Sequence, residues 1–162
     1  MSFHIKAALT GGLIVLVVWT LLIPFASSSP DAQKEIEAFN KKLEDVTLRM
    51  DNAGVMALWA EDGASLLPGM APMEGKKIIA KWLDGIVAQM PGYRVTKQVD
   101  DFREIQISGD WASEWGTTFQ VVQPPEGKPP IESHGKILLV LHRENDGEWK
   151  IKQEMWNAGV QP

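Results

Sequence analysis

The spacing of apolar residues predicts a helix where the polar part of the chain begins. Its apolar positions recur at alternating steps of three and four: Ile36, Phe39, Leu43, Val46 and Met50. This spacing gives one apolar stripe along an otherwise charged helix. Pro30 and Asp31 suit its first turn, because the acid lies near the positive end of the helix dipole.

Two further helices are predicted before residue 92. The segment VMALWAED indicates a short helix that ends at two adjacent acids, Glu61 and Asp62. After a proline-glycine loop, a third helix carries its apolar side chains on one side: Ile78, Ile79, Trp82, Leu83, Ile86 and Val87. Pro91 and Gly92 are expected to end this third helix.

The hydrophobic period changes to that of strands in the second half. DFREIQISGDWASEWGTTFQVV alternates across a turn, IESHGKILLVLHR is rich in β-forming residues, and GEWKIKQEMWN alternates again. The prolines of QPPEGKPP exclude that segment from a sheet interior, because proline lacks a backbone donor. About four antiparallel strands are therefore expected after three helices. Helices that precede strands, instead of alternating with them, predict one α+β domain over residues 30–162.

Alternation along each strand predicts which side chains face the helices. In the last strand, the inner face is assigned five residues: Trp149, Ile151, Gln153, Met155 and Asn157. In the strand before it, the inner face is assigned Ile137, Leu139 and Leu141. Glu114 is expected on the outer face, in an ion pair with Lys136.

The outer face of the predicted sheet is itself partly apolar. Leu138 and Val140 alternate with the inner residues of their strand, and Trp156 is assigned to the same outer side. Two interpretations are open. Either a second copy packs on this face and forms a homodimer, or these are scattered apolar residues of an ordinary surface.

The first 29 residues form a separate segment. MSFHIK carries one certain positive charge, Lys6, and an uncharged apolar run follows over residues 7–26. This is typical of a secretory signal, with Ala26 and Ser28 as cleavage positions, and Pro24 favours it. The same run is long enough to span a bilayer as an uncleaved anchor. Both interpretations place the domain outside the cytoplasm, either periplasmic or secreted.

Composition removes several classes of function. The net charge of -5 argues against nucleic acid, whose phosphates require a basic face. The chain has no cysteine, so disulfides and thiolate chemistry are excluded. His134 and His142 lie about 26 Å apart along one predicted strand, too far to share a metal ion. No phosphate loop or catalytic triad is found, and no cofactor or metal is expected.

Three stretches together resemble the nuclear-transport-factor-2-like superfamily: LWAEDGASLLPGMAPMEGKKIIAKWL, GDWASEWGTTFQVV and GKILLVLHRENDGEWKIKQEMWN. They are most similar to its SnoaL-like branch and to the related domain of unknown function 4440, over residues 33–157. The resemblance implies a cone of curved antiparallel sheet wrapped over three helices. It also implies a pocket at the wide end and, commonly, a homodimer formed through the back of the sheet.

The resemblance also bears on the chemistry. Members that isomerise steroids carry their proton-abstracting aspartate where this chain has Leu67, and they use a tyrosine as an oxyanion donor. The only tyrosine here, Tyr93, is placed in the turn after the third helix. Steroid isomerisation is therefore not expected. Glu61 and Asp62 match acids that many members share. We favour a structural role for them at the helix end and keep Asp62 as a pocket candidate.

A tryptophan-rich apolar pocket is the leading prediction for the site. Its candidate lining residues are Trp59, Asp62, Trp82, Ser113, Trp115, Gln153, Met155 and Asn157. Such a pocket suits a small hydrophobic molecule, although the same rings would also fill an ordinary core. The leading hypothesis is an exported small-molecule-binding domain. Its alternatives are a cyclase- or isomerase-like enzyme with Asp62 as base, and a module that dimerises through the sheet.

Overall fold

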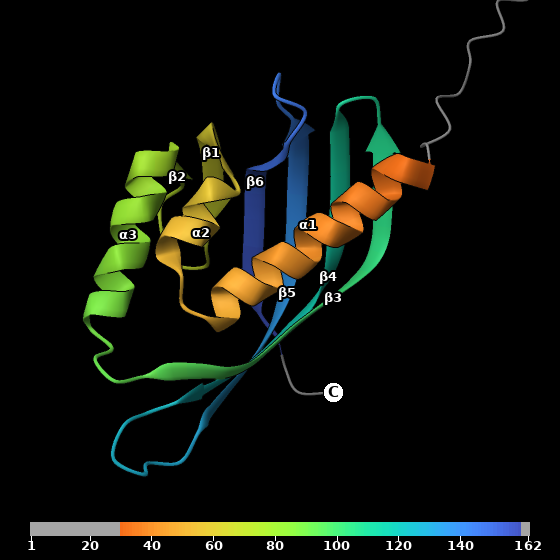
Figure 1. Ribbon diagram of the computed structural model, residues 1–162. Helices are drawn as coiled ribbons and strands as arrows, with labels where there is room; N and C mark the ends of the chain where they lie inside the picture. Colours follow the sequence, from red (N-terminus) through yellow and green to blue (C-terminus); the bar gives the residue numbers. More distant parts are fainter. Residues whose placement is uncertain (1–29, 160–162) are drawn as a thin grey trace, which may run out of the picture.

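A six-stranded sheet carries three helices on one side (Figure 1). The computed structural model describes residues 30–159, so the predicted signal or anchor segment lies outside the described residues. The helices are α1 (Pro30–Leu48), α2 (Asn52–Ala57) and α3 (Lys76–Ala88). The strands are β1 (Trp59–Leu66), β2 (Met73–Glu74), β3 (Arg94–Ser108), β4 (Trp111–Gln123), β5 (Ile131–Arg143) and β6 (Trp149–Ala158). Within residues 30–159, none of the helices has the length and apolarity of a membrane span.

The sheet has the order β2-β1-β6-β5-β4-β3. Strands β3 to β6 form an antiparallel meander, which confirms the four predicted strands and the α+β class. The expectation of a purely antiparallel sheet is wrong, because β1 runs parallel to β6. No hairpin joins these two strands. Instead, α3 carries the chain away from β1 to the far edge of the sheet, which leaves β1 free to run parallel to its neighbour.

The predicted second helix ends earlier than its sequence indicates. Asp51 caps α2 by accepting a hydrogen bond from the Gly54 amide at 2.9 Å, and α2 ends at Ala57. From Trp59 the chain is strand, so Glu61 and Asp62 lie on β1 and do not close a helix. Pairing with β6 decides this, since tertiary contacts override a weak local preference for helix.

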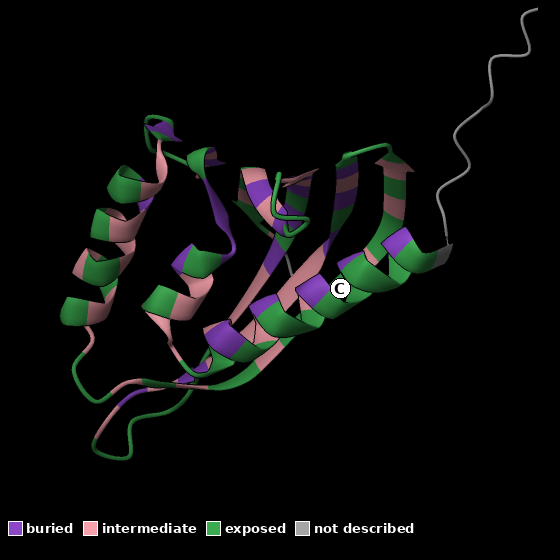
Figure 2. Ribbon diagram, turned by 45° about the horizontal axis from the view of Figure 1, so that its top comes forward, coloured by how far each residue is buried: buried purple, intermediate pink, exposed green. Residues whose placement is uncertain are grey.

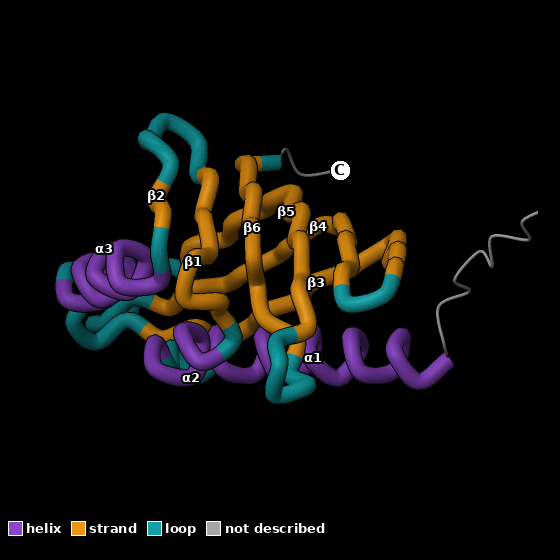
Figure 3. The backbone as a smooth tube through the Cα atoms, turned by 90° about the horizontal axis from the view of Figure 1, so that it is seen from above, coloured by secondary structure: helices purple, strands orange, loops and turns teal. Residues whose placement is uncertain are grey.

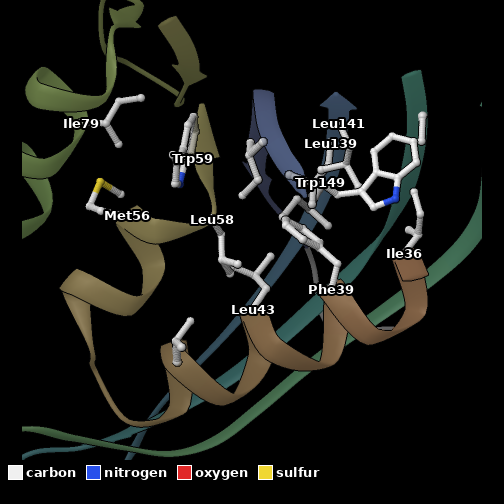
Figure 4. Close-up of a cluster of buried hydrophobic side chains, with 14 of the residues drawn as sticks. Ile36, Phe39, Leu43, Met56, Leu58, Trp59, Ile79, Leu139, Leu141 and Trp149 are labelled. Carbon is white, nitrogen blue, oxygen red and sulfur yellow. The ribbon is translucent and has the colours of Figure 1, made fainter. Parts of the chain in front are cut away.

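The apolar stripe of α1 packs on the inner face of the sheet (Figures 2 and 4). Its predicted residues Ile36, Phe39, Leu43 and Val46 are all buried. Leu139 and Leu141, which were assigned to the inner face of β5, are 0% exposed beneath them. Complete burial of such a side chain contributes about 1.5–3 kcal/mol, so this layer holds the helix on the sheet.

A β-bulge in β6 reverses the faces of its second half. Leu141 pairs with Ile151 and Val140 pairs with Gln153, which leaves one extra residue in β6 between these pairs. Trp149 and Ile151 face the helices as predicted. Beyond the bulge, three residues assigned to the inner face lie on the outer face instead: Gln153, Met155 and Asn157. Trp156, assigned to the outer face, pairs with the buried Ile137 and lies inside. Strict alternation fails across a bulge.

The faces of β4 also differ from the prediction. Glu114 pairs directly with the buried Leu139 and is itself only 2% exposed. It cannot form the predicted surface ion pair with Lys136, which is exposed on the opposite face. Ser113 and Trp115, which were expected to face the helices, lie on the outer face. The inner face of β4 thus carries small and acidic residues instead of aromatic rings.

Candidate functional site

Acidic side chains occupy one part of the inner face of the sheet. Glu114 on β4 and Glu154 on β6 are the two neighbours of Leu139 in a single cross-strand row. Ser65 on β1 extends that row beyond Glu154. Asp100 on β3 lies farther along the inner face, paired with Thr118. The meander therefore brings together three carboxyl groups that are 14 and 40 residues apart in the sequence.

Each of these acids receives one hydrogen bond from a neutral group. The Asn40 amide on α1 donates to Glu114 Oε2 at 2.7 Å. The Ser65 hydroxyl donates to Glu154 Oε2 at 2.9 Å. Neither glutamate forms an ion pair with any Lys, Arg or His of residues 30–159. Burial of a carboxyl group without a cation favours its neutral form.

Asp100 is held by a chain of two glutamines. Gln98 Nε2 donates to Asp100 Oδ1 at 2.7 Å, and Gln120 Nε2 donates to Gln98 Oε1 at 2.9 Å. These bonds leave Oδ2 as the free oxygen of the carboxyl group. When Asp100 is protonated, its proton is therefore expected on Oδ2, because Oδ1 accepts the hydrogen bond from Gln98.

The pKa values of the three acids are raised. Burial raises the pKa of Asp100 to about 6 against the opposing effect of the Gln98 hydrogen bond, and the charge of Glu44 adds to the rise. Burial likewise raises the pKa of Glu114 to about 7, opposed by Asn40 and assisted by Asp100. The pKa of Glu154 rises for the same leading reason. The pKa values of Asp100 and Glu114 thus lie near neutral pH, as acid-base chemistry requires.

A groove of about 480 Å³ runs between α1 and β3 beside these acids. Figure 3 shows α1 lying along one side of the sheet. Asn40 and Glu44 line the groove from α1, and Asp100, Phe102 and Ile105 line it from β3. Its volume lies within the range of small-molecule sites. Most of its lining side chains are polar or charged, and Phe102 and Ile105 supply the apolar wall. The groove therefore gives a small molecule access to Asp100 and Asn40.

The predicted tryptophan pocket does not assemble, because its rings lie in separate places. Trp59 and Trp149 are buried in the core at 3% and 5% exposure (Figure 4). Trp82 on α3 is half-buried against that core. Trp115 is 44% exposed on the outer face, where its Nε1 donates to Glu104. The other candidates Ser113, Gln153, Met155 and Asn157 also lie on the outer face.

Asp62 lies apart from the acidic site. Its carboxylate is exposed and forms an ion pair with Lys152, which lowers the pKa of Asp62. Glu61 is also exposed and pairs with Lys76 at 3.1 Å. Asp62 was kept as a pocket candidate and as the base of the enzyme alternative, but the acids whose pKa is raised are Asp100, Glu114 and Glu154.

Residues 47–153 match the family described as SnoaL-like domain. This chain belongs to the SnoaL-like family. The match confirms the SnoaL-like, nuclear-transport-factor-2-like resemblance, and the narrower branch of domain of unknown function 4440 stays a prediction. No curated protein matches the chain.

Solved structures share the fold of this SnoaL-like chain. A ketosteroid isomerase-like protein from Erwinia carotovora atroseptica has a TM-score of 0.66 and 20% identity, over 80% of this chain and 96% of that chain. ActVI-ORFA from Streptomyces coelicolor has a TM-score of 0.68 and 17% identity, over 79% and 97%. An NTF2-like protein with a cystatin-like fold from Novosphingobium aromaticivorans has a TM-score of 0.64 and 16% identity, over 82% and 84%.

The positions expected to bear on steroid chemistry lie where the sequence placed them. Leu67 follows β1 and packs its apolar side chain against the core. Tyr93 lies in the turn after α3, where its amide bonds the Met90 carbonyl. The acidic site of this SnoaL-like domain therefore uses other positions, on β3, β4 and β6.

The raised pKa values predict how stability depends on pH. The native state keeps protons on Asp100 and Glu114 that the unfolded chain releases near its ordinary pKa values of 3.8 and 4.5. The contribution of these two groups to the free energy of unfolding is therefore largest below pH 4. It is lost as the pH rises through about 6 for Asp100 and about 7 for Glu114. Glu114→Gln keeps the acceptor for Asn40 and removes one such group. We expect the free energy of unfolding of this variant to exceed that of the wild type by on the order of 2 kcal/mol at pH 8 and by little at pH 4.

Urea unfolding at pH 4, 6 and 8 measures this difference. Asp62→Asn is the matched control, because it removes an exposed carboxylate whose pKa is lowered by Lys152, and it should show no such gain at pH 8. A Glu114→Gln variant whose stability relative to the wild type is the same at all three pH values would contradict the burial of an uncompensated carboxyl group.

Proposed function

We propose that this SnoaL-like chain is an exported domain that binds a small molecule between α1 and the sheet. The observation that supports this function is an open groove lined by Asp100 and by Asn40, whose amide donates to the buried Glu114. Buried carboxyl groups without a cation lower the stability of a fold, so stability alone gives no reason to have them. Perturbed carboxyl groups beside a concave surface are typical of binding and catalytic sites.

Binding is expected to depend on Asp100, the acid that lines the groove. A panel of small neutral, cationic and anionic compounds should contain at least one that raises the melting temperature saturably, because a ligand of the native state stabilises it. Calorimetry should then show affinity at least about tenfold weaker for Asp100→Asn, and unchanged for Asp62→Asn. If no compound binds, or if both variants bind like the wild type, the groove is not the site.

A second candidate function is proton transfer on the bound molecule. The pKa values of about 6 and about 7 for Asp100 and Glu114 suit a general acid and base near neutral pH. One relative in fold carries the name ketosteroid isomerase-like. NMR of the mixture would detect conversion of a compound that binds. At saturating ligand, Asp100→Asn should then abolish conversion, because Asp100 is the acid that lines the groove, whereas conversion at the wild-type rate would exclude Asp100.

Dimer formation through the outer face is a further part of the proposal. Trp115, Leu138 and Met155 lie side by side across β4, β5 and β6, and each is more than 40% exposed. With Val140 on the same face they give an apolar patch of the kind that interfaces bury. Trp156 does not contribute, since it lies on the inner face.

Light scattering over a range of concentrations tests the dimer. The wild type is expected to be dimeric, and Leu138→Lys with Val140→Lys is expected to be monomeric while it still folds. Ile131→Lys is the control, because Ile131 is 50% exposed at the far end of β5. A wild-type monomer, or dissociation of the control alone, would contradict an interface at this patch.

Export is proposed from residues 1–29. The single charge of Lys6, the apolar run and the small residues after it are typical of a signal. We expect the domain in the extracytoplasmic fraction, with an intact mass that shows the loss of the first 26 to 29 residues. An intact chain in the membrane fraction would support the anchor alternative, and an intact chain in the cytoplasm would contradict export.

A further inference from the structure

The groove between α1 and β3 is lined mainly by hydrogen-bond acceptors. Glu37 and Glu44 line it from α1, and Asp100 and Asp101 line it from β3. Two cations line it as well. Arg103 is already paired with Asp101 at 3.6 Å, and Lys41 is on α1. Within residues 30–159, no ion pair joins Asp100 to either cation.

Two buried acceptors beside Asp100 lack a donor among the described residues. They are Asn40 Oδ1 and Glu114 Oε1, on two side chains that are joined by the hydrogen bond from Asn40 Nδ2. Glu114 is 98% buried, so solvent has little access to it. Buried acceptors are normally paired. When Glu114 is ionised, Asn40 Oδ1 has no donor, and Asn40 is the member of this pair that lines the groove.

The free oxygen of Asp100 adds a third acceptor at the same place. Oδ1 is bonded to Gln98, and Oδ2 has no partner within residues 30–159. No group of three or more His, Asp or Glu side chains in that range is spaced to hold a metal ion. The donor that would complement these acceptors is therefore a group with several N–H bonds and a positive charge, which is an ammonium group.

We infer that the groove binds a small primary amine in its protonated form, with the ammonium group donating to Asp100 and Asn40. This rests on the proposed function and names its ligand class. Phe102 and Ile105 supply apolar wall for the rest of the molecule. The ligand is thus a compact amine with an apolar aliphatic or aromatic tail.

Three probes of one shape and different charge test the inference. They are 2-phenylethylamine, 2-phenylethanol and 3-phenylpropionate, titrated by calorimetry into the full domain at pH 7.5. The amine should bind at least about tenfold more tightly than the alcohol, and the carboxylate should not bind. Asp100→Asn should reduce the affinity for the amine to that for the alcohol. Asp62→Asn, which removes an exposed carboxylate elsewhere, should change neither.

The outcomes separate the inference from the function on which it rests. If amine and alcohol bind equally, or if Asp100→Asn weakens both alike, the groove binds small molecules and the inference of a cationic ligand is wrong. If none of the three probes binds, and no compound of the wider panel does, the proposed function falls together with the inference. Should Asp100→Asn fail to fold, Glu44→Gln replaces it, since Glu44 also lines the groove and should weaken the amine alone.

Discussion

The packing of α1 on the inner face of the sheet determines both the core and the candidate site. Ile36, Phe39 and Leu43 cover Leu139 and Leu141, and this contact excludes water from the apolar end of the sheet. Helical spacing places Asn40 and Glu44 on the flank of the same stripe, toward β3. A helix that packed elsewhere would leave Glu114 open to water and would remove the groove.

A second contact fixes the position of α1 along the strands. Glu35 pairs with Arg143 of β5 and accepts a hydrogen bond from Trp149 Nε1 of β6 at 3.0 Å. The Arg143 guanidinium also lies over the Trp149 ring, 4.7 Å from its centre. These contacts restrict sliding of the helix, so Asn40 stays within reach of Glu114. The acidic site thus depends on the contacts that Glu35 makes nearer the start of α1.

The sequence was sufficient for those elements whose pattern is strong over many residues. The stripe of α1 and the inner residues Leu139 and Leu141 are where the periodicity placed them. The strand WAEDGASL was missed, because its pairing with β6 is a tertiary contact that no local pattern in the segment indicates. The end of β6 was misassigned because one bulge, which the alternation does not reveal, exchanges its faces.

Glu114 was the most consequential residue to be misplaced. On β4 the tryptophans alternate with Ala112, Glu114 and Gly116, and hydrophobicity alone assigns the tryptophans to the interior. The structure reverses this assignment, since Ala112, Glu114 and Gly116 pair with the buried residues of β5. A Cβ atom on Gly116 would lie 2.2 Å from the Asp101 carbonyl, beside an irregular pairing of β3. Small residues are needed there. The small residues Ala112 and Gly116, two positions before and after Glu114, were the available signal that Glu114 faces the interior.

The inner face of the sheet holds acids whose charge no cation of residues 30–159 compensates. The most direct test is a pH titration of the side-chain carboxyl carbons by NMR, with Asp100→Asn and Glu114→Gln to assign the two resonances. The account predicts titration midpoints near 6 for Asp100 and near 7 for Glu114. Midpoints below about 5 for both would contradict it, because they would place the two carboxyl groups in water or beside a cation.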